Sequence, residues 1–301
     1  MWRRLSILLV ALVTGLPVTF ADITVTDDAG QVLRLPAPAR RIVSLAPHAT
    51  ELLFAAGAGA QVVGVSDYSD YPPAARQLPR IGGATLDMER IAALHPDLIV
   101  AWPDGMSALQ LQQLRKLQHP VYLSAPRRLD DIPAALERMA VLSAAPEQAR
   151  QTAASLRREL QQLRQAHGTH RDKVRVFYQI WDKPLLTLNG QHIVSDAITT
   201  CGGENIFAQL PALTPSVSLE NVLQTNPDAI ISPDHNHQPA PWLAEWKRWP
   251  HLTAVQKNHL FSISADLINR PGPRMIEGTL ALCKLLNQAR RIENPFSINH
   301  D

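Results

Sequence analysis

Apolar and polar positions along the chain follow two different periods in turn. Short apolar runs bounded by turn residues are typical of buried strands, and an apolar residue every three or four positions is typical of an amphipathic helix. The two kinds of segment alternate, which predicts an α/β fold with parallel sheets, preceded by a small hairpin at 23–35. The main predicted strands are 41–45, 62–65, 121–123, 175–180 and 260–264, and the main predicted helices are 50–57, 107–117, 130–142, 193–200 and 275–290.

One pattern occurs twice. Residues 88–100 read MERIAALHPDLIV and residues 219–231 read LENVLQTNPDAII, an offset of 131 residues. Each copy predicts a short helix carrying Glu89 or Glu220, a Pro-Asp turn and a buried strand, because proline disfavours a helical conformation in the residue before it. We infer a duplicated unit, with one copy in each half of the chain. The alternative is a chance likeness between two ordinary helix-to-strand connections.

A single long helix is predicted at the junction of the two halves, over 146–167. Its apolar residues at 149, 153, 156, 160 and 163 form one narrow stripe, and Gly168 stands where helices commonly end. At 1.5 Å per residue the helix is a rod of roughly 33 Å, which favours a rigid connector over a surface helix of one lobe. The predicted organisation is an N-terminal lobe over 22–143, a connecting helix over 144–168 and a C-terminal lobe over 169–301.

The first 21 residues have the features of a secretory signal peptide. Arg3 and Arg4 give a positive start, residues 5–18 are apolar, and Thr19-Phe20-Ala21 places small residues before the predicted cleavage site. The alternative is a membrane anchor, but the apolar run is shorter than the ~20 residues that span a bilayer and Pro17 interrupts it. We therefore predict export, by the general or the twin-arginine route.

Composition is consistent with an exported protein of two lobes. The chain has 301 residues, 46% of them hydrophobic, which is enough for two cores. It contains 29 Lys and Arg against 27 Asp and Glu, and loss of Arg3 and Arg4 with the signal peptide leaves 27 of each. A nearly neutral protein argues against a nucleic-acid partner, which requires a basic face.

Two cysteines, Cys201 and Cys283, are the only pair available for a bond in an oxidising compartment. We expect a disulfide, which would contribute on the order of 4 kcal/mol by closing a loop of this length. The alternatives are a metal site, which two cysteines without nearby histidines do not make, or two buried free thiols.

Catalytic motifs are absent from the sequence. We find no G-x-S-x-G, H-E-x-x-H, P-loop or G-x-G-x-x-G pattern, and Cys201-Gly-Gly203 follows a predicted helix, where a dinucleotide loop would need a strand. An enzyme is therefore not the preferred interpretation. Residues 234–237 place His235 and His237 two apart, as in some metal sites, but a polar loop is favoured and no bound metal is expected.

The ends of the predicted strands carry the candidate ligand contacts, because ligands of open parallel sheets bind beyond the carboxyl ends of the strands. Tyr68 and Trp102 follow strands of the first half, next to Pro47-His48; Trp181 and the loop 266–274 follow strands of the second half. Aromatic surface with Asp and Arg groups suits a large, partly flat ligand that carries amides or carboxylates. The alternative role for each aromatic residue is packing between the lobes.

Several motifs resemble a known family in the same order along nearly the whole mature chain. They are RIVSLAPHATELLFAAG, GVSDYSDYPP, MERIAALHPDLIVAW, CGGENIF and DLINRPGPR. The sequence is similar to the periplasmic vitamin B12-binding proteins of ABC-type cobalamin importers, within class III of the solute-binding proteins, whose two lobes are joined by one rigid helix. The first three motifs also suit iron-siderophore and haem relatives.

The resemblance implies a role for particular residues. Tyr68 and the loop 266–270 would contact a corrinoid from opposite lobes, with Trp102 in the wall. Glu89 and Glu220 match the two acids that dock such proteins to arginines of the membrane permease, and Cys201 and Cys283 match the family's disulfide. The chain differs from the family's pattern at Thr214, which lacks an aromatic ring, and at three of the expected ligand contacts. The full set of expected ligand contacts is Tyr68, Trp102, Trp181, Asp266, Leu267, Ile268, Asn269 and Arg270, of which Trp181, Leu267 and Ile268 are the three that differ.

The predicted function is therefore capture of cobalamin or a related corrinoid in the periplasm and its delivery to an ABC permease by a monomeric protein without a cofactor. The first alternative is a carrier of a ferric siderophore or of haem. The second, from another class, is a secreted metal-dependent hydrolase that uses His235 and His237. Because the connecting helix contains no hinge, we also predict a small closure on ligand binding.

Overall fold

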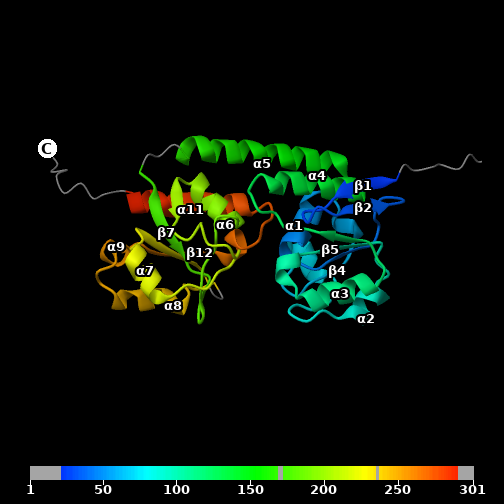
Figure 1. Ribbon diagram of the computed structural model, residues 1–301. Helices are drawn as coiled ribbons and strands as arrows, with labels where there is room; N and C mark the ends of the chain where they lie inside the picture. Colours follow the sequence, from blue (N-terminus) through cyan, green and yellow to red (C-terminus); the bar gives the residue numbers. More distant parts are fainter. Residues whose placement is uncertain (1–21, 169–171, 235–236, 291–301) are drawn as a thin grey trace, which may run out of the picture.

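The computed structural model describes residues 22–168, 172–234 and 237–290. Two lobes lie side by side beneath α5 (Pro146–His167), which spans both (Figure 1). The N-terminal lobe is the part of the chain before α5, and the C-terminal lobe is the part after it. The predicted signal peptide and His235 lie outside the described residues. Within the described ranges, no helix is both long and apolar enough to cross a membrane.

Each lobe contains a four-stranded parallel sheet, and the two sheets have the same topology. In both sheets, the strand that comes second in the chain lies at one edge, and the strand that comes first lies next to it. This confirms the predicted α/β fold. The N-terminal sheet has the order β4 (Val62–Val65), β3 (Ile42–Ser44), β5 (Leu98–Ala101), β6 (Val121–Leu123), and the C-terminal sheet has the order β10 (Gly203–Asn205), β7 (Val174–Tyr178), β11 (Ala229–Pro233), β12 (Leu260–Ile263).

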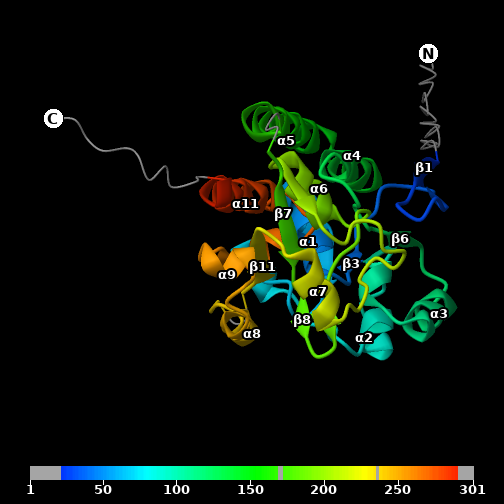
Figure 2. The same cartoon turned by 60° about the vertical axis from the view of Figure 1, so that its left-hand side comes forward.

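Helices cover both faces of each sheet. On the face toward α5 lie α1 (Pro47–Ala55) and α4 (Asp131–Ser143) in the N-terminal lobe, and α6 (Ile193–Thr200) and α11 (Met275–Arg290) in the C-terminal lobe. The opposite faces carry α2 (Met88–Ala93), α3 (Ala108–Lys116), α7 (Leu219–Thr225), α8 (Pro241–Glu245) and α9 (Thr253–Gln256) (Figure 2). The smaller elements are β1 (Ile23–Thr26), β2 (Val32–Leu35), β8 (Trp181–Asp182), β9 (Leu185–Leu186) and α10 (Ala265–Ile268).

The duplicated pattern extends to helix caps and backbone conformation. The side chain of Asp87 accepts a hydrogen bond from the third backbone N–H of α2, and Ser218 does the same for α7. After each helix one residue adopts a left-handed conformation, His95 with φ 44° and Asn226 with φ 45°. Both pairs are separated by the offset of 131 residues found in the sequence, so the two units share a backbone path.

The Pro-Asp turn of each unit fastens the start of the lobe's first core strand. The Asp97 carboxylate accepts hydrogen bonds from the backbone N–H groups of Arg40 and Arg41 at 2.8 and 2.9 Å, and Asp228 accepts one from Arg175 at 2.9 Å. These bonds lie at the amino ends of the strands, away from the ends where ligands bind. The repeated aspartates therefore have a structural role.

Helix α5 ties the two lobes to one core. All five apolar positions of its predicted stripe are buried, and it packs on α4 and α1 in one lobe and on α11 and α6 in the other. Bidentate ion pairs join Arg157 to Glu137 and Arg164 to Asp130. A single cluster of buried apolar residues runs through both lobes beneath this helix.

A disulfide joins Cys201, at the end of α6, to Cys283 in α11, as expected. Both residues are fully buried on the face of the C-terminal sheet that lies toward α5. The bond fixes the two helices that pack on α5 in this lobe, so it supports the lobe's attachment to the connecting helix.

Candidate functional site

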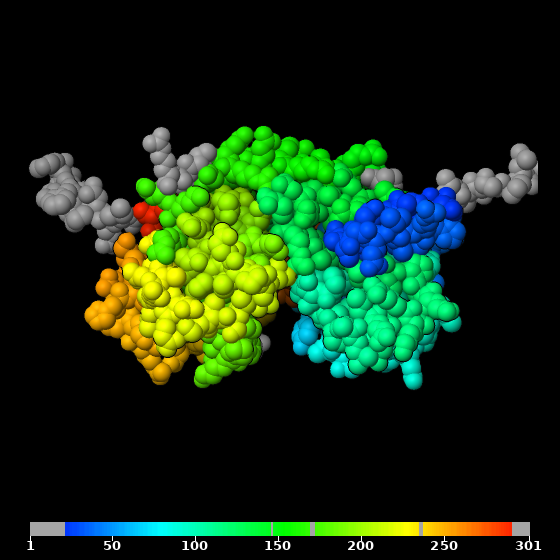
Figure 3. Space-filling view, viewed as in Figure 1, coloured from blue at the N-terminus to red at the C-terminus, as the bar shows by residue number. Residues whose placement is uncertain are grey.

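A groove runs between the two lobes and opens on the side opposite α5 (Figure 3). Its floor contains a cavity of about 390 Å³ to which both lobes contribute. The carboxyl ends of β5 and β7 lead into it, as expected for parallel sheets. The N-terminal lobe contributes Trp102, Asp104, Pro126 and Arg127, and the C-terminal lobe contributes Tyr178, Ile180, Leu188, His192, Ile193, Leu213, Thr214, Asn269 and Pro271.

Trp102 forms an aromatic wall of this cavity and is held from two sides. Its ring meets the edge of the His48 ring at a centroid distance of 5.6 Å. Gly105 also lies against the ring: a Cβ added there would come within 2.3 Å of the indole, so only glycine leaves the ring in place. His48 is itself buried, with Nε2 3.3 Å from the carbonyl oxygen of Ser124, and burial lowers the pKa of His48 to about 4.

The facing wall, from the C-terminal lobe, combines apolar surface with a few polar groups. The buried Tyr178 hydroxyl lies 3.3 Å from Oδ1 of Asn269. His192 caps α6 by accepting a hydrogen bond at Nδ1 from the Val194 N–H, and burial lowers the pKa of His192 to about 4. Its imidazole is therefore neutral at pH 7. Such a wall can stack on a flat apolar ligand and donate or accept a few hydrogen bonds.

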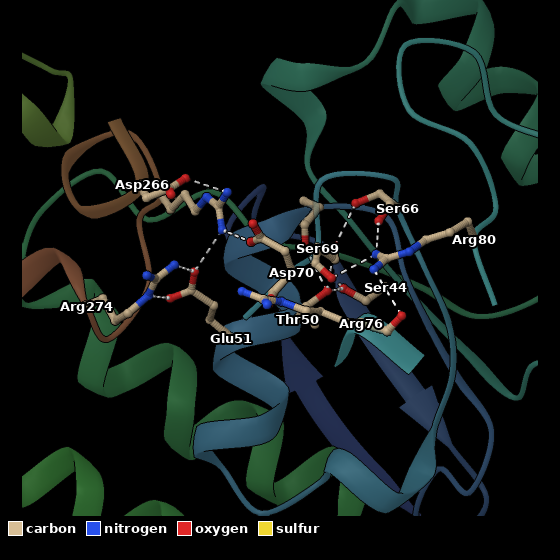
Figure 4. Close-up of polar contacts among 12 residues, drawn as sticks. Ser44, Thr50, Glu51, Ser66, Ser69, Asp70, Arg76, Arg80, Asp266 and Arg274 are labelled. Atoms are coloured by element: carbon tan, nitrogen blue, oxygen red, sulfur yellow. Dashed lines mark hydrogen bonds and ion pairs between the residues drawn. The ribbon is translucent and has the colours of Figure 1, made fainter. Parts of the chain in front are cut away.

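A cluster of ion pairs joins the lobes beside the cavity; we call it the inter-lobe ion cluster (Figure 4). Arg270 pairs through Nη1 with Asp70 and through Nη2 with Asp266, both at 2.6 Å. Arg274 binds Glu51 with two hydrogen bonds, of 3.0 and 2.6 Å. Glu51 and Asp70 belong to the N-terminal lobe. The remaining members, Asp266 and the two arginines, belong to the C-terminal lobe. The cluster consists of Glu51, Asp70, Asp266, Arg270 and Arg274.

The electrostatics of the cluster favour its ionised form. Partial burial acts to raise the pKa of Asp70, but the hydrogen bond and charge of Arg270 outweigh it and lower this pKa below the ordinary value. The hydrogen bond to Glu51 raises the pKa of Arg274. Glu51 is almost wholly buried, with 1% of its side chain exposed, and both arginines pair with it there.

The predicted ligand contacts do not all reach the cavity. Trp102 and Asn269 line it, and Asp266 and Arg270 belong to the adjacent ion cluster. Tyr68 is 72% exposed on the loop after β4, and so has surface free for a ligand.

The remaining three predicted contacts lie differently. The ring of Trp181 packs against Trp242 at 5.3 Å, with 43% of the residue exposed. Leu267 is half-buried, and its carbonyl packs closely against Gly278 of α11. Ile268 is fully buried in the core, because α10 turns that side chain inward. In this conformation the Ile268 side chain has no surface exposed to a ligand, and its contact stays a prediction.

The two candidate docking acids occupy matching positions in the repeated unit. Glu89 and Glu220 are exposed in the first turns of α2 and α7, and these helices lie on the side of the molecule away from α5 (Figure 1). Hydrogen bonds from its own backbone N–H and from Ser218 lower the pKa of Glu220. Each lobe thus presents one exposed carboxylate on the side of the molecule away from α5.

Metal ligands do not gather in this part of the chain. Among residues 22–168, 172–234 and 237–290, no group of three or more His, Cys, Asp or Glu side chains is arranged to hold a metal ion. The loop with His235 and His237 lies partly outside these ranges.

Sequence reasoning missed several residues of the site. Tyr178 and His192 were not predicted because the strand-end rule pointed to Trp181, three residues beyond Tyr178. Glu51 and Arg274 are 223 positions apart, and no spacing rule connects them. One signal was present: Glu51 is an acid within the otherwise apolar segment ELLFAA, which indicates a buried charge that requires a partner.

Comparison with known proteins gives consistent matches. A family model described as "Periplasmic binding protein" matches residues 42–267. The vitamin B12-binding protein of Vibrio parahaemolyticus is 36% identical over 92% of this chain and 96% of its own length. That of Vibrio cholerae is 40% identical over 86% of this chain and 94% of its own length.

Solved structures match over the same region. The crystal structure of the periplasmic vitamin B12-binding protein of Vibrio cholerae superposes with a TM-score of 0.77 at 40% identity, covering 85% of this chain and 99% of that one. A periplasmic haem-binding protein of Roseiflexus superposes with a TM-score of 0.73 at 23% identity, covering 84% of this chain and 100% of that one, which shows a shared fold.

Proposed function

The chain belongs to the periplasmic binding protein family, together with the vitamin B12-binding proteins of Vibrio, and from this premise we propose that it captures cobalamin or a related corrinoid for an ABC importer. The family consists of binding proteins and not of enzymes. A hydrolase that uses His235 and His237 is therefore set aside. The periplasm, reached through the signal peptide at residues 1–21, is its proposed location.

One observation supports the proposed ligand most directly: the groove between the lobes has an aromatic wall on one side and an apolar wall with few polar groups on the other. Trp102 faces Tyr178, Leu188 and Asn269 across the cavity. A corrinoid has a flat macrocycle with amide side chains around its edge, and this combination requires stacking surface together with a few hydrogen-bonding groups. The cavity of about 390 Å³ would hold only part of such a ligand, and the open groove above it would hold the rest.

The proposed mechanism is burial without reaction. The macrocycle would enter between the lobes, with Trp102 and Tyr68 on the N-terminal side. On the C-terminal side, Asn269 and Arg270 would bind the amides, while Trp181 and Leu267 would contact the rim. We propose that residues 22–143 and 169–301 close on the ligand by a small movement, because the connector over 144–168 is a continuous helix packed on both lobes.

Delivery would use the repeated acids. Glu89 and Glu220 occupy matching positions on α2 and α7, so a monomer would present two similar contacts to a permease with two-fold symmetry. Basic side chains on the permease are the expected partners. Both acids are exposed, and exposed charges attract groups of opposite charge on a partner and so guide association.

Titration of the purified mature protein with cyanocobalamin tests the proposal, with haem and a ferric siderophore as competing ligands. We expect binding of cyanocobalamin at micromolar concentration or below, and none of comparable strength for the other two. Preference for haem or for the siderophore would instead support the alternative carrier functions. Failure of cyanocobalamin to bind at micromolar concentration would overturn the proposal.

A further inference from the structure

The loop between α10 and α11 crosses from the C-terminal lobe to the N-terminal lobe and is fixed there at two points. Arg270 reaches Asp70, and Arg274, four residues later, reaches Glu51. The guanidinium of Arg274 also lies 3.9 Å above the centre of the Tyr71 ring. Both arginines are largely buried, with 14% and 19% of their side chains exposed. The attachment is therefore a built contact between the lobes.

The N-terminal side of this contact is rigid. The Ser69 hydroxyl, next to Asp70, is hydrogen-bonded to the hydroxyls of Thr50 and Ser66, both at 2.9 Å. Arg80 donates to the carbonyl oxygens of Ser66 and Ser69 at 3.0 and 2.8 Å. All three hydroxyl groups are buried. This network holds the loop against α1, so the Asp70 carboxylate is presented at a fixed place (Figure 4).

The same C-terminal loop also forms part of the cavity. Asn269 and Pro271, the neighbours of Arg270, both line it. The side chain of Arg270 lies between the two lobes: Asp266 of its own lobe holds Nη2 at 2.6 Å, and Asp70 of the other lobe holds Nη1 at 2.6 Å, with Glu51 3.5 Å from the same nitrogen. A guanidinium held from two sides cannot turn without breaking one of the two pairs.

We propose that Asp70 is a positioning residue for ligand binding. It acts across the groove by holding the Arg270 guanidinium, and with the Glu51–Arg274 pair it sets the distance between the lobes before a ligand arrives. This inference rests on the proposed corrinoid-binding function. It adds a residue of the opposite lobe that acts through Arg270 and needs no contact with the ligand itself.

Preorganisation is the physical reason for such an arrangement. A ligand that enters a groove of preset width does not have to order the lobes or the arginine, so less of its binding free energy is lost. Asp70 is half-exposed, and exposed ion pairs contribute little to overall stability. Its loss should therefore change the groove much more than it changes folding.

The first test measures the lobes without a ligand. Gln113 on α3 and Gln224 on α7 are exposed, and the only two cysteines are joined in the disulfide, so Gln113→Cys and Gln224→Cys allow two spin labels to be attached selectively. We expect one narrow distance distribution in the parent protein and a broader one after Asp70→Asn. The matched control is Asp67→Asn, which removes an exposed acid from the same loop and should leave the distribution unchanged. Equal distributions for all three proteins would overturn the proposal.

The second test measures binding in the unlabelled protein. Asp70→Asn should weaken cyanocobalamin binding by on the order of tenfold, as expected for loss of one partly screened charge-assisted hydrogen bond. Asp70→Glu, which keeps the charge, should recover part of the affinity. With Arg270→Gln already present, Asp70→Asn should have no further effect, because Asp70 acts through that arginine. Independent, multiplying effects of the two substitutions would contradict the proposal.

The two tests also separate this inference from the proposed function. If the parent protein does not bind cyanocobalamin but Asp70→Asn still broadens the lobe distances, the proposed ligand is wrong and the lobe contact stands. If the parent binds and Asp70→Asn alters neither distances nor affinity, the function stands and the positioning role is wrong. Unfolding midpoints of each variant, measured alongside, should lie close to that of the parent.

Discussion

Replacing His48 by glutamine should make folding less sensitive to acid. His48 is buried beside Trp102, and its Nε2 lies 3.3 Å from the Ser124 carbonyl oxygen. A glutamine amide can donate to the same carbonyl but does not titrate. The substitution therefore removes one titrating group from beneath the groove while keeping its hydrogen bond.

The sign and the size of the change in the free energy of unfolding follow from the pKa values of His48 in the folded and the unfolded protein. Burial lowers the pKa of His48 to about 4 in the folded protein, whereas the ordinary value of the unfolded chain is about 6.5. Between these values the unfolded state binds more protons, so the free energy of unfolding falls as pH decreases through 6.5 and levels off near 4. At pH 5 the loss attributable to this one residue is about 2 kcal/mol relative to pH 7.5.

Urea unfolding of the parent and of His48→Gln at pH 7.5 and pH 5 measures this quantity as a double difference, which cancels the contribution of every other group. We expect the parent to lose about 2 kcal/mol more than the variant between the two pH values. His251→Gln, at an exposed histidine, is the matched control and should lose as much free energy of unfolding between the two pH values as the parent does. Equal losses in the parent and in His48→Gln would show that His48 is not held neutral by burial.

Four further outcomes are expected. Trp102→Ala should weaken cyanocobalamin binding by on the order of tenfold in a calorimetric titration, because it removes the aromatic wall. Replacing Cys201 and Cys283 together by serine should lower the free energy of unfolding by about 4 kcal/mol in urea, since the 82-residue separation makes the closed loop long. Glu89→Arg with Glu220→Arg should abolish uptake in a transport assay and leave ligand affinity intact. Crystal structures with and without ligand should differ by a small lobe rotation; a rotation of tens of degrees would refute the rigid connector.

The elements predicted best are those with strong local signals. The helices α5, α6 and α11 have the predicted bounds because each combines helical spacing of apolar residues with clear end signals. For α1 the sequence predicts a start near Thr50, but the helix begins at Pro47, since proline is well tolerated in a first turn. Strand β10 was not predicted: Gly203-Glu204-Asn205 has little strand propensity and becomes a strand by pairing with β7.

The site was predicted only where it follows from local rules. The strand-end rule located Trp102 and the loop 266–274, and the family resemblance singled out residues 266–270 within that loop. Neither source could show that Ile268 points into the core. The direction of a side chain in the single turn of α10 depends on how this turn packs on α11. The contacts of the inter-lobe ion cluster that join the two lobes depend on tertiary structure, since they connect residues 200 or more positions apart, and only the Asp266–Arg270 pair is local.

The two lobes share the features that shape their backbone, and they differ in the side chains that face each other across the groove. Caps, left-handed residues and Pro-Asp turns recur at one offset, and so do the two exposed glutamates. Two identical lobes would present the same residues on both faces of the groove. Here two carboxylates, Glu51 and Asp70, come from one side and two arginines, Arg270 and Arg274, from the other. This asymmetry allows a duplicated fold to close on itself, and it places a fixed arginine on only one face of a groove proposed to hold a flat ligand.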